Sequence, residues 1–243
     1  MELNRVAIVT GGNRGIGYGI SVELAAANFN VAIIYYRRKE EADRTVDEIR
    51  EMGRKANAYQ ADISRSDEVT RVITEIYNVF GRIDVLVNNA GLASKSSTVD
   101  LTEQMWDRIV DVNLKGTHLC SQAVIPFMQR ASYGRIINMT SIAGQTGGGI
   151  GPHYAASKAG VIGLTRFMAT ELGPYGITVN AISPSGVPTD LLLSLGMEPN
   201  AARPVRRVGT PEDIATATVY LASESASYVT GQVLSVNGGS YFG

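Results

Sequence analysis

A glycine-rich turn follows the first apolar run of this chain and stands directly before a helical pattern. Val6–Thr10 has the composition of a buried strand, and the chain then reads Gly11-Gly12-Asn13-Arg14-Gly15-Ile16-Gly17. Glycine tolerates positive φ and lets other groups approach its backbone closely, so this turn can be tight. The first amide groups of the helix expected over 16–28 have no partner within that helix, and such groups bind anions. A strand, a glycine-rich turn and a helix in this order therefore predict a loop for a nucleotide pyrophosphate.

The same alternation of strand and helix continues along the chain. Short, almost wholly apolar runs predict a parallel sheet that is covered on both faces. We expect strands over 6–10, 31–36, 56–60, 83–87, 135–139, 177–182 and 233–236. Helices are expected over 16–28, 40–52, 66–80 with Ser66 as a candidate N-cap, 102 to about 130 in pieces, 152–172, and from Thr210-Pro211 onward. The fold class is therefore α/β, a single Rossmann-like, doubly wound domain over 1–243 with a short substrate lid at about 189–208.

Composition and charge exclude several classes of function. Hydrophobic residues make up 44% of the chain and charged residues 19%, and the net charge is −1, which gives no reason to expect binding to nucleic acid or to an anionic membrane. The first five residues lead straight into a strand, so we expect no signal peptide. Cys120 is the only cysteine and is expected in the core, which favours a cytoplasmic location. Two histidines are too few for a metal cluster, so no metal is expected.

A second group of residues has the spacing of a proton-transfer site. Tyr154 and Lys158 are four residues apart on an expected helix and therefore share one face. A lysine cation near a phenol, together with a positively charged oxidised nicotinamide, lowers the pKa of the phenol. Tyr154 could then donate a proton to a carbonyl oxygen or remove one from an alcohol, while Ser141 polarises the same oxygen.

Taken in order, these motifs resemble the short-chain dehydrogenase/reductase family over essentially the whole chain. The matching features are the spacing Gly11-x3-Gly15-x-Gly17, Asp62-Ile63, Asn88-Asn89-Ala90-Gly91, Asn113, Ser141, Tyr154-x3-Lys158 and the segment 180–190. The pattern is most similar to 3-oxoacyl-(acyl-carrier-protein) reductases and related NADPH-dependent ketone reductases. The resemblance implies an oxidoreductase that reduces a ketone to an alcohol, with catalytic residues Asn113, Ser141, Tyr154 and Lys158. It also implies that Asn113 holds a helix kink and a water on the proton path.

The resemblance further implies which residues hold the cofactor, NADPH or NADP+. Asp62 and Ile63 would bind the adenine, and the Val187 backbone and Thr189 hydroxyl would bind the carboxamide. The family usually has glycine directly after Pro184, whereas this chain has Ser185, so Gly186 is expected to make the turn. The full set of implied cofactor-binding residues is Gly11, Asn13, Arg14, Gly15, Ile16, Gly17, Arg37, Asp62, Ile63, Asn89, Ala90, Gly91, Tyr154, Lys158, Pro184, Val187 and Thr189.

The choice between NADPH and NADH rests on the end of the second expected strand. Enzymes that prefer NAD usually place an acid there, on the ribose 2′-hydroxyl, but this strand ends Tyr35-Tyr36-Arg37-Arg38-Lys39. Guanidinium groups bind phosphate with charge-assisted and often bidentate hydrogen bonds. We therefore predict that Arg14 and Arg37 bind a 2′-phosphate and that Lys39 is only solvated.

The sequence is less informative about the substrate, for which a small molecule and an acyl thioester both stay open. Reductases that act on carrier-bound substrates commonly have basic residues before the fifth and sixth strands, but here those places read Ala131-Ser132-Tyr133 and Gly173-Pro174-Tyr175, with Arg130 displaced. The lid residues 191–197 are mostly apolar, which fits an apolar substrate or a lid packed on itself. A sugar or small-ketone dehydrogenase, or a non-catalytic NADP(H) sensor, is the alternative. By resemblance, a homotetramer is expected.

Overall fold

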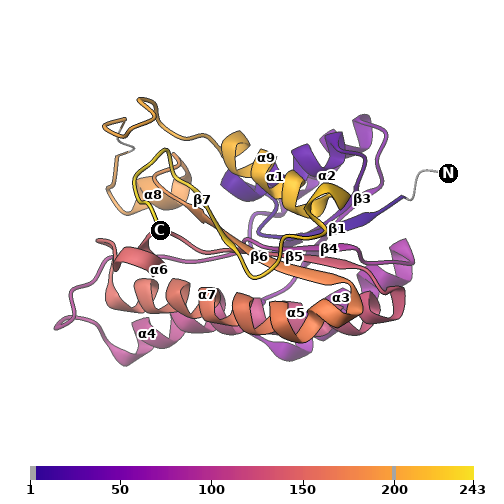
Figure 1. The fold of residues 1–243 in the computed structure, drawn as a ribbon, viewed down its shortest axis with the longest axis horizontal. Coiled ribbons are helices and arrows are strands. Elements are labelled where there is room, and N and C mark those ends of the chain that lie inside the picture. Colours follow the sequence, from indigo (N-terminus) through magenta and orange to yellow (C-terminus); the bar gives the residue numbers. More distant parts are fainter. Residues whose placement is uncertain (1–3, 199–200) are drawn as a thin grey trace.

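In the computed structural model, which describes residues 4–198 and 201–243, one sheet of seven parallel strands forms the centre of the molecule (Figure 1). The strands lie in the order β3-β2-β1-β4-β5-β6-β7. Their bounds are β1 Val6–Thr10, β2 Asn30–Tyr35, β3 Ala56–Gln60, β4 Val85–Asn88, β5 Gly134–Met139, β6 Ile177–Pro184 and β7 Val233–Val236. The order reverses between β1 and β4, which is the place where sheets of this kind bind ligands at the carboxyl ends of their strands. The predicted doubly wound α/β fold is confirmed.

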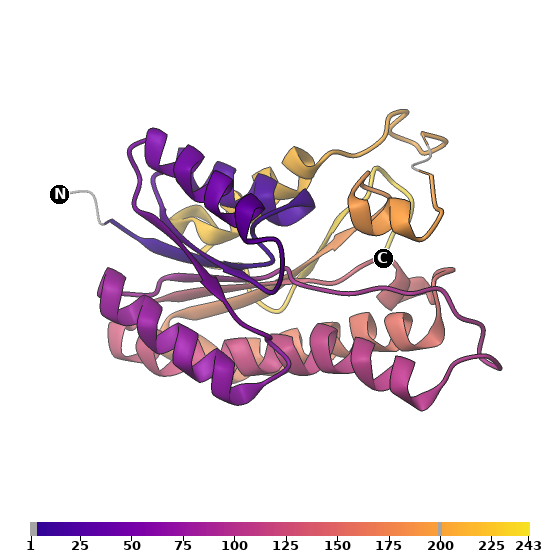
Figure 2. The ribbon, with the colours of Figure 1, turned by 180° about the vertical axis from the view of Figure 1, so that it is seen from behind.

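Helices cover both faces of the sheet. On one face lie α1 Gly15–Ala26, α2 Lys39–Glu51 and α9 Pro211–Ala222; on the other lie α3 Ser66–Phe80, α4 Glu103–Val110, α5 Gly116–Ala131 and α7 Pro152–Leu172 (Figures 1 and 2). Short helices follow β5 and β6, namely α6 Ala143–Thr146 and α8 Asp190–Ser194. A π-helical segment, Asp111–Lys115, joins α4 to α5, and 3-10 turns occupy Gly173–Tyr175 and Glu224–Ala226.

The core has two parts because the side chains of each strand alternate between the faces. Ala7 and Val9 of β1 pack with Leu24 of α1 and Ile49 of α2. Ile8, between them, faces the other way and packs among residues of α3, α5 and α7. Cys120 of α5 belongs to this second part, and burial raises the pKa of its thiol to about 12. The expectation that this cysteine is a core residue is confirmed.

Several element boundaries differ from the sequence prediction. The helix α3 does begin at Ser66, but its N-cap residue is Arg65, so the predicted role of Ser66 as N-cap is wrong. The strand β4 begins at Val85 rather than at residue 83, and just before it the Asp84 carboxylate accepts a hydrogen bond from the Val6 amide at 2.8 Å. The strand β6 continues to Pro184 because its end pairs with β7. Neither α6 nor α8 was predicted.

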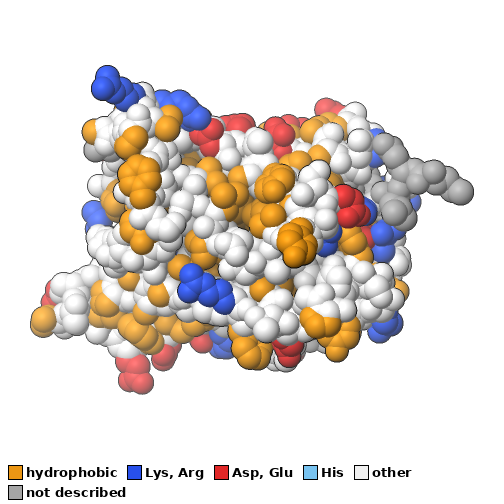
Figure 3. All heavy atoms as spheres, viewed as in Figure 1, with side chains coloured by type: hydrophobic (Ala, Val, Ile, Leu, Met, Phe, Trp, Pro, Cys, Tyr) orange, Lys and Arg blue, Asp and Glu red, His pale blue; other side chains and the backbone are white. Residues whose placement is uncertain are grey.

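The long helical region expected from residue 102 is indeed in pieces, and its break is the π-helical segment. The start of α9 also agrees with the prediction: Thr210 and Asp213 form a capping box and Pro211 occupies the first turn. No helix among the described residues is long and apolar enough to cross a membrane. In Figure 3, hydrophobic side chains gather on the face where α9 and β7 lie, and exposed members include Tyr220 and Leu234.

Candidate active site

The glycine loop between β1 and α1 has the backbone geometry that its sequence predicts. Gly11 and Gly15 have positive φ values of 64° and 54°. A Cβ on Gly17 would stand only 2.0 Å from the carbonyl oxygen of Gly11, so this close approach requires glycine. The helix α1 then starts with no side-chain cap at Arg14 and no acid in its first turn. Its first amide groups are therefore free to receive an anion.

Hydrogen bonds hold this loop against the end of β4. The Thr10 hydroxyl accepts hydrogen bonds from the amides of Asn89 and Ala90, each at 3.0 Å. The Asn89 side chain in turn donates to the carbonyl oxygens of Thr10, at 2.9 Å, and Gly11, at 3.2 Å. The ends of β1 and β4, where the sheet order reverses, are thus fixed to one another.

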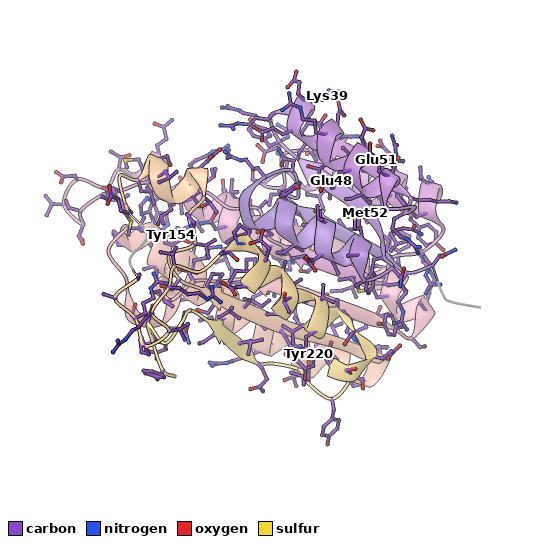
Figure 4. The ribbon with its side chains drawn as sticks, turned by 90° about the horizontal axis from the view of Figure 1, so that it is seen from above. Lys39, Glu48, Glu51, Met52, Tyr154 and Tyr220 are labelled. Carbon is purple, nitrogen blue, oxygen red and sulfur yellow. The ribbon has the colours of Figure 1, made fainter. Side chains whose placement is uncertain are left out.

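Ser141, Tyr154 and Lys158 come together because the end of β5 is bound to the first turns of α7. The Thr140 hydroxyl donates to the Lys158 carbonyl at 2.8 Å, and Lys158 Nζ donates to the Met139 carbonyl at 2.8 Å. Lys158 Nζ stands 5.9 Å from the centre of the Tyr154 ring, and the Ser141 hydroxyl is near enough to the Tyr154 hydroxyl to lower its pKa. The three predicted side chains therefore form one group; Figure 4 shows Tyr154 at the loop-rich end of the molecule, away from Met52 at the far end of α2.

Burial governs the protonation of this group. It raises the pKa of Tyr154, and the interaction with the Ser141 side chain opposes this effect only in part. Burial also lowers the pKa of Lys158 to about 8. The predicted lowering of the Tyr154 pKa involves a bound oxidised nicotinamide as well as Lys158, so it stays a prediction. A protonated tyrosine beside a mostly cationic lysine is the state at neutral pH.

Asn113 lies behind this group and is fully buried in the π-helical segment. Its side chain accepts from the Leu92 amide at 2.7 Å and donates to the Leu92 carbonyl at 2.9 Å. It also donates to Ser157 Oγ at 3.2 Å, and Ser157 donates to the Tyr154 carbonyl at 2.8 Å. Asn113 thus connects the irregular helix to the strand end and to the helix of Tyr154.

The opposite end of the site is rich in cations. Arg14 and Arg38 each form an ion pair with Asp190, at 3.2 and 3.3 Å, and Arg38 also pairs with Glu41 at 2.8 Å. Arg37, which we predicted as the partner of Arg14, lies with its guanidinium 5.2 Å from the centre of the Tyr36 ring and forms no ion pair among the described residues. Arg38 was missed by the sequence reasoning. It has a positive φ of 65° and shares the Asp190 carboxylate with Arg14, and no sequence pattern indicates such a turn at an arginine.

Lys39 and Asp62 each form an ion pair of their own. Lys39 is exposed and pairs with Asp43 at 2.6 Å, in agreement with the predicted solvated position. Burial alone would raise the pKa of Asp62, but hydrogen bonds from Ser64 and the nearby Arg108 outweigh it, so the pKa is lowered. Asp62 is therefore ionised at neutral pH, and Arg108, 3.7 Å away, is a second residue of this region that the sequence did not indicate.

The segment after β6 turns where the sequence predicts, although Ser185 stands at the position where the family usually has glycine. Gly186 has a φ of 55°, so it makes the turn beside Ser185 as expected. A side chain at Gly186 would collide with the guanidinium of Arg203, which donates to the Ser185 carbonyl at 2.8 Å. The structure thus adds Arg203, from the connection between α8 and α9, as a support for the segment after β6.

One cavity of about 1120 Å³ joins all of these regions. The residues that line it include every predicted site residue except the buried Asn113; that set is Gly11, Asn13, Arg14, Gly15, Ile16, Gly17, Arg37, Asp62, Ile63, Asn89, Ala90, Gly91, Ser141, Tyr154, Lys158, Pro184, Val187 and Thr189. Near Tyr154 the wall is apolar, with Leu92, Ala93 and Ile150. Within the described part of the chain, no group of three or more His, Cys, Asp or Glu side chains could hold a metal ion.

Comparison with known proteins decides the family. A family model described as enoyl-(acyl carrier protein) reductase matches residues 11–241. The 3-oxoacyl-[acyl-carrier-protein] reductase FabG of Staphylococcus epidermidis is 43% identical, with 98% of this chain and 100% of the relative covered. A 3-oxoacyl-[acyl-carrier-protein] reductase of Synechocystis is 41% identical over 97% of this chain and 96% of the relative. The chain belongs to the short-chain dehydrogenase/reductase family.

Solved structures of other short-chain dehydrogenases have the same fold. Acetoin dehydrogenase from Salmonella typhimurium superposes with a TM-score of 0.90 at 35% identity, covering 98% of this chain and 96% of that one. Levodione reductase superposes with a TM-score of 0.91 at 31% identity, covering 97% and 96%. This short-chain dehydrogenase is therefore an oxidoreductase that acts on carbonyl and alcohol groups.

Proposed function

We propose that this short-chain dehydrogenase uses NADPH to reduce a ketone of the 3-oxoacyl thioester type to an alcohol. The observation that carries the proposal is the placement of two groups along one cavity. Ser141, Tyr154 and Lys158 line the cavity together with the glycine loop and with Arg14. A proton donor and an anion-binding loop in one continuous space are what nicotinamide-dependent reduction of a carbonyl needs.

The residues present fit a dinucleotide. Free amide groups at the start of α1 suit its pyrophosphate, and the cations at Arg14, Arg37 and Arg38 suit a 2′-phosphate. Asp62 and Ile63 would hold the adenine, and Val187 and Thr189 the carboxamide. When bound, the reduced nicotinamide supplies the hydride that the carbonyl carbon accepts.

The protein's own part in the reaction is the proton. Ser141 would hold the carbonyl oxygen through its hydroxyl, and Tyr154 would donate its phenolic proton to that oxygen. The raised pKa of Tyr154 keeps this proton in place until the oxygen becomes basic. With a pKa of about 8, Lys158 is still mostly protonated at pH 7, so it can stabilise the phenolate that remains. Asn113 would support the resupply of the proton from solvent.

A small-ketone dehydrogenase is the second candidate. The solved structures that superpose on this chain are named for acetoin and levodione, and the positions before β5 and β6 lack the basic residues expected for a carrier protein. The segment 189–208 would be the substrate lid in either case, although residues 199 and 200 lie outside the described residues. We place the enzyme in the cytoplasm, which fits its single buried cysteine.

An activity panel distinguishes the candidates. Purified protein is mixed with NADPH and, separately, with a short 3-oxoacyl thioester, an α-hydroxyketone, a cyclic diketone or an enoyl thioester, and the loss of reduced-cofactor absorbance is followed. We expect the highest kcat/KM for the 3-oxoacyl thioester. A higher value for a small ketone favours the second candidate, and oxidation of NADPH only with the enoyl thioester would overturn both.

The variant Tyr154→Phe tests the proton donor in the same assay. It removes only the hydroxyl, so NADPH binding should stay at the wild-type level while turnover falls by at least about a hundredfold. Tyr175→Phe, in the exposed turn after α7, is the matched control and should retain turnover. Turnover near the wild-type level in Tyr154→Phe would remove this tyrosine from its proposed role.

A further inference from the structure

One carboxylate lies between two arginines that come from different parts of the fold. Oδ2 of Asp190 is 3.2 Å from Nη1 of Arg14, in the glycine loop, and 3.3 Å from Nη1 of Arg38, at the start of α2. The three residues are far apart in sequence and all line the same cavity. Two guanidinium groups that converge on a single oxygen mark a position for an anion.

This arrangement is open to exchange with a stronger anion. The side chains of Arg14, Arg38 and Asp190 are 46%, 50% and 61% exposed. Ion pairs at such exposure contribute little to stability. A phosphate monoester carries nearly two negative charges near neutral pH and has three acceptor oxygens, so it binds a pair of arginines better than a single carboxylate does.

Asp190 also connects this position to the lid. It is the first residue of α8, and the preceding Thr189 is the N-cap of that helix. The methyl group of Thr189 would stand 3.2 Å from a Cβ on Gly15, so α8 begins directly against the glycine loop. Farther along, Leu192 lines the cavity, and Figures 1 and 2 both show α8 at the end of the sheet, apart from the large helices.

We propose that Asp190 is a specificity-determining residue that occupies the anion position between Arg14 and Arg38 until a ribose 2′-phosphate replaces it. The exchange frees the start of α8 from the two arginines, so binding of the phosphate is coupled to release of α8. NAD(H), which has no 2′-phosphate, leaves Asp190 paired. This inference rests on the proposed use of NADPH. It adds a residue, Asp190, that competes with the 2′-phosphate of that cofactor for the two arginines.

Equilibrium binding to Asp190→Asn tests the exchange, because asparagine keeps the shape and removes the charge. Calorimetric titration should show NADP+ binding about threefold to tenfold tighter than in the wild type, the range expected when two exposed ion pairs no longer compete. Binding of NAD+ should change by less than about twofold, and the gain for NADP+ should shrink at high salt, where exposed charges are screened. Asp43→Asn is the matched control: it removes the same charge from an ion pair with Lys39 on the outer part of α2.

A second measurement uses the wild-type protein. Hydrogen exchange over residues 190–195 is compared with 2′,5′-ADP and with 5′-ADP bound, two probes that differ in the 2′-phosphate. Faster exchange with 2′,5′-ADP alone is expected.

The outcomes separate this inference from the proposed function. A wild type that binds NADP+ no better than NAD+ contradicts the proposed cofactor. The role of Asp190 alone is overturned by another result. In it, the wild type prefers NADP+, Asp190→Asn has an unchanged or weaker preference for NADP+ over NAD+, and hydrogen exchange over 190–195 is equal with both probes.

Discussion

Alanine at Gly17 tests the geometry of the glycine loop most directly. A Cβ there would stand 2.0 Å from the Gly11 carbonyl oxygen and 2.5 Å from Asn89 Nδ2. Neither neighbour can withdraw freely. The Gly11 amide donates to the Ile34 carbonyl at 2.7 Å, and Asn89 Nδ2 donates to the Thr10 carbonyl at 2.9 Å. The added methyl group must therefore displace the loop or the helix start.

The expected magnitude follows from two opposing effects. Overpacking of a tight site costs about 1–3 kcal/mol, and the contact with a backbone oxygen places Gly17→Ala in the upper part of that range. Alanine in a helix recovers about 1 kcal/mol relative to glycine. We expect a net loss of about 1–2 kcal/mol in the free energy of unfolding. Displacement of the loop should also weaken NADPH binding at least about tenfold, which corresponds to about 1.4 kcal/mol.

The matched control is Gly173→Ala. Gly173 has a φ of −50°, and a Cβ there would meet nothing within 4 Å. This variant should be neutral or up to about 1 kcal/mol more stable, because alanine restricts the unfolded chain. Denaturant unfolding at a fixed protein concentration and fluorescence titration with NADPH measure both variants. If Gly17→Ala matches Gly173→Ala in stability and the wild type in NADPH affinity, the steric reasoning is wrong.

The remaining predictions concern the cofactor, pH and assembly. Arg37→Asp should shift the kcat/KM ratio from NADPH toward NADH, since repulsion replaces attraction; an unchanged ratio would exclude Arg37 from the phosphate site. Burial lowers the pKa of His153 from its ordinary value of 6.5, so its contribution to stability is present above pH 6.5 and is lost as the pH falls below that value. Unfolding at pH 7.5 and 5.5 should therefore show a smaller acid loss for His153→Asn than for the wild type, and equal losses would contradict this. We also expect a D2 tetramer of 26.0 kDa subunits paired through their long helices and last strand, with a dimer as second choice. Phe167→Glu, at an exposed site on α7, should dissociate this assembly, as measured by sedimentation velocity. A single monomer peak for the wild-type protein would refute the assembly.

Features that depend on neighbouring residues could be predicted from the sequence. The glycine spacing at 11, 15 and 17 sets a local turn, and the interval between Tyr154 and Lys158 sets a common helix face. Alternating apolar strands and helices specified the parallel sheet, whose carboxyl edge collects the ends of β1, β4, β5 and β6. The fold, the glycine loop and the shared face of Tyr154 and Lys158 followed from these short-range patterns. The resemblance to a family supplied the other residues of the cavity, among them Asp62, Val187 and Thr189, and their chemical roles.

Features that depend on distant segments were decided by the tertiary structure. Asp190 and Arg203 come from the connection after β6, and nothing in their own surroundings in the sequence indicates that they reach Arg14 or Gly186. Arg38, which has a positive φ, pairs with Asp190, and a partner 152 residues away in the sequence cannot be read from the neighbours of Arg38. The protonation of Tyr154 likewise follows from burial, which only the folded chain creates. Local patterns fix backbone geometry over a few residues, whereas ion pairs and desolvation depend on which surfaces the whole fold brings into contact.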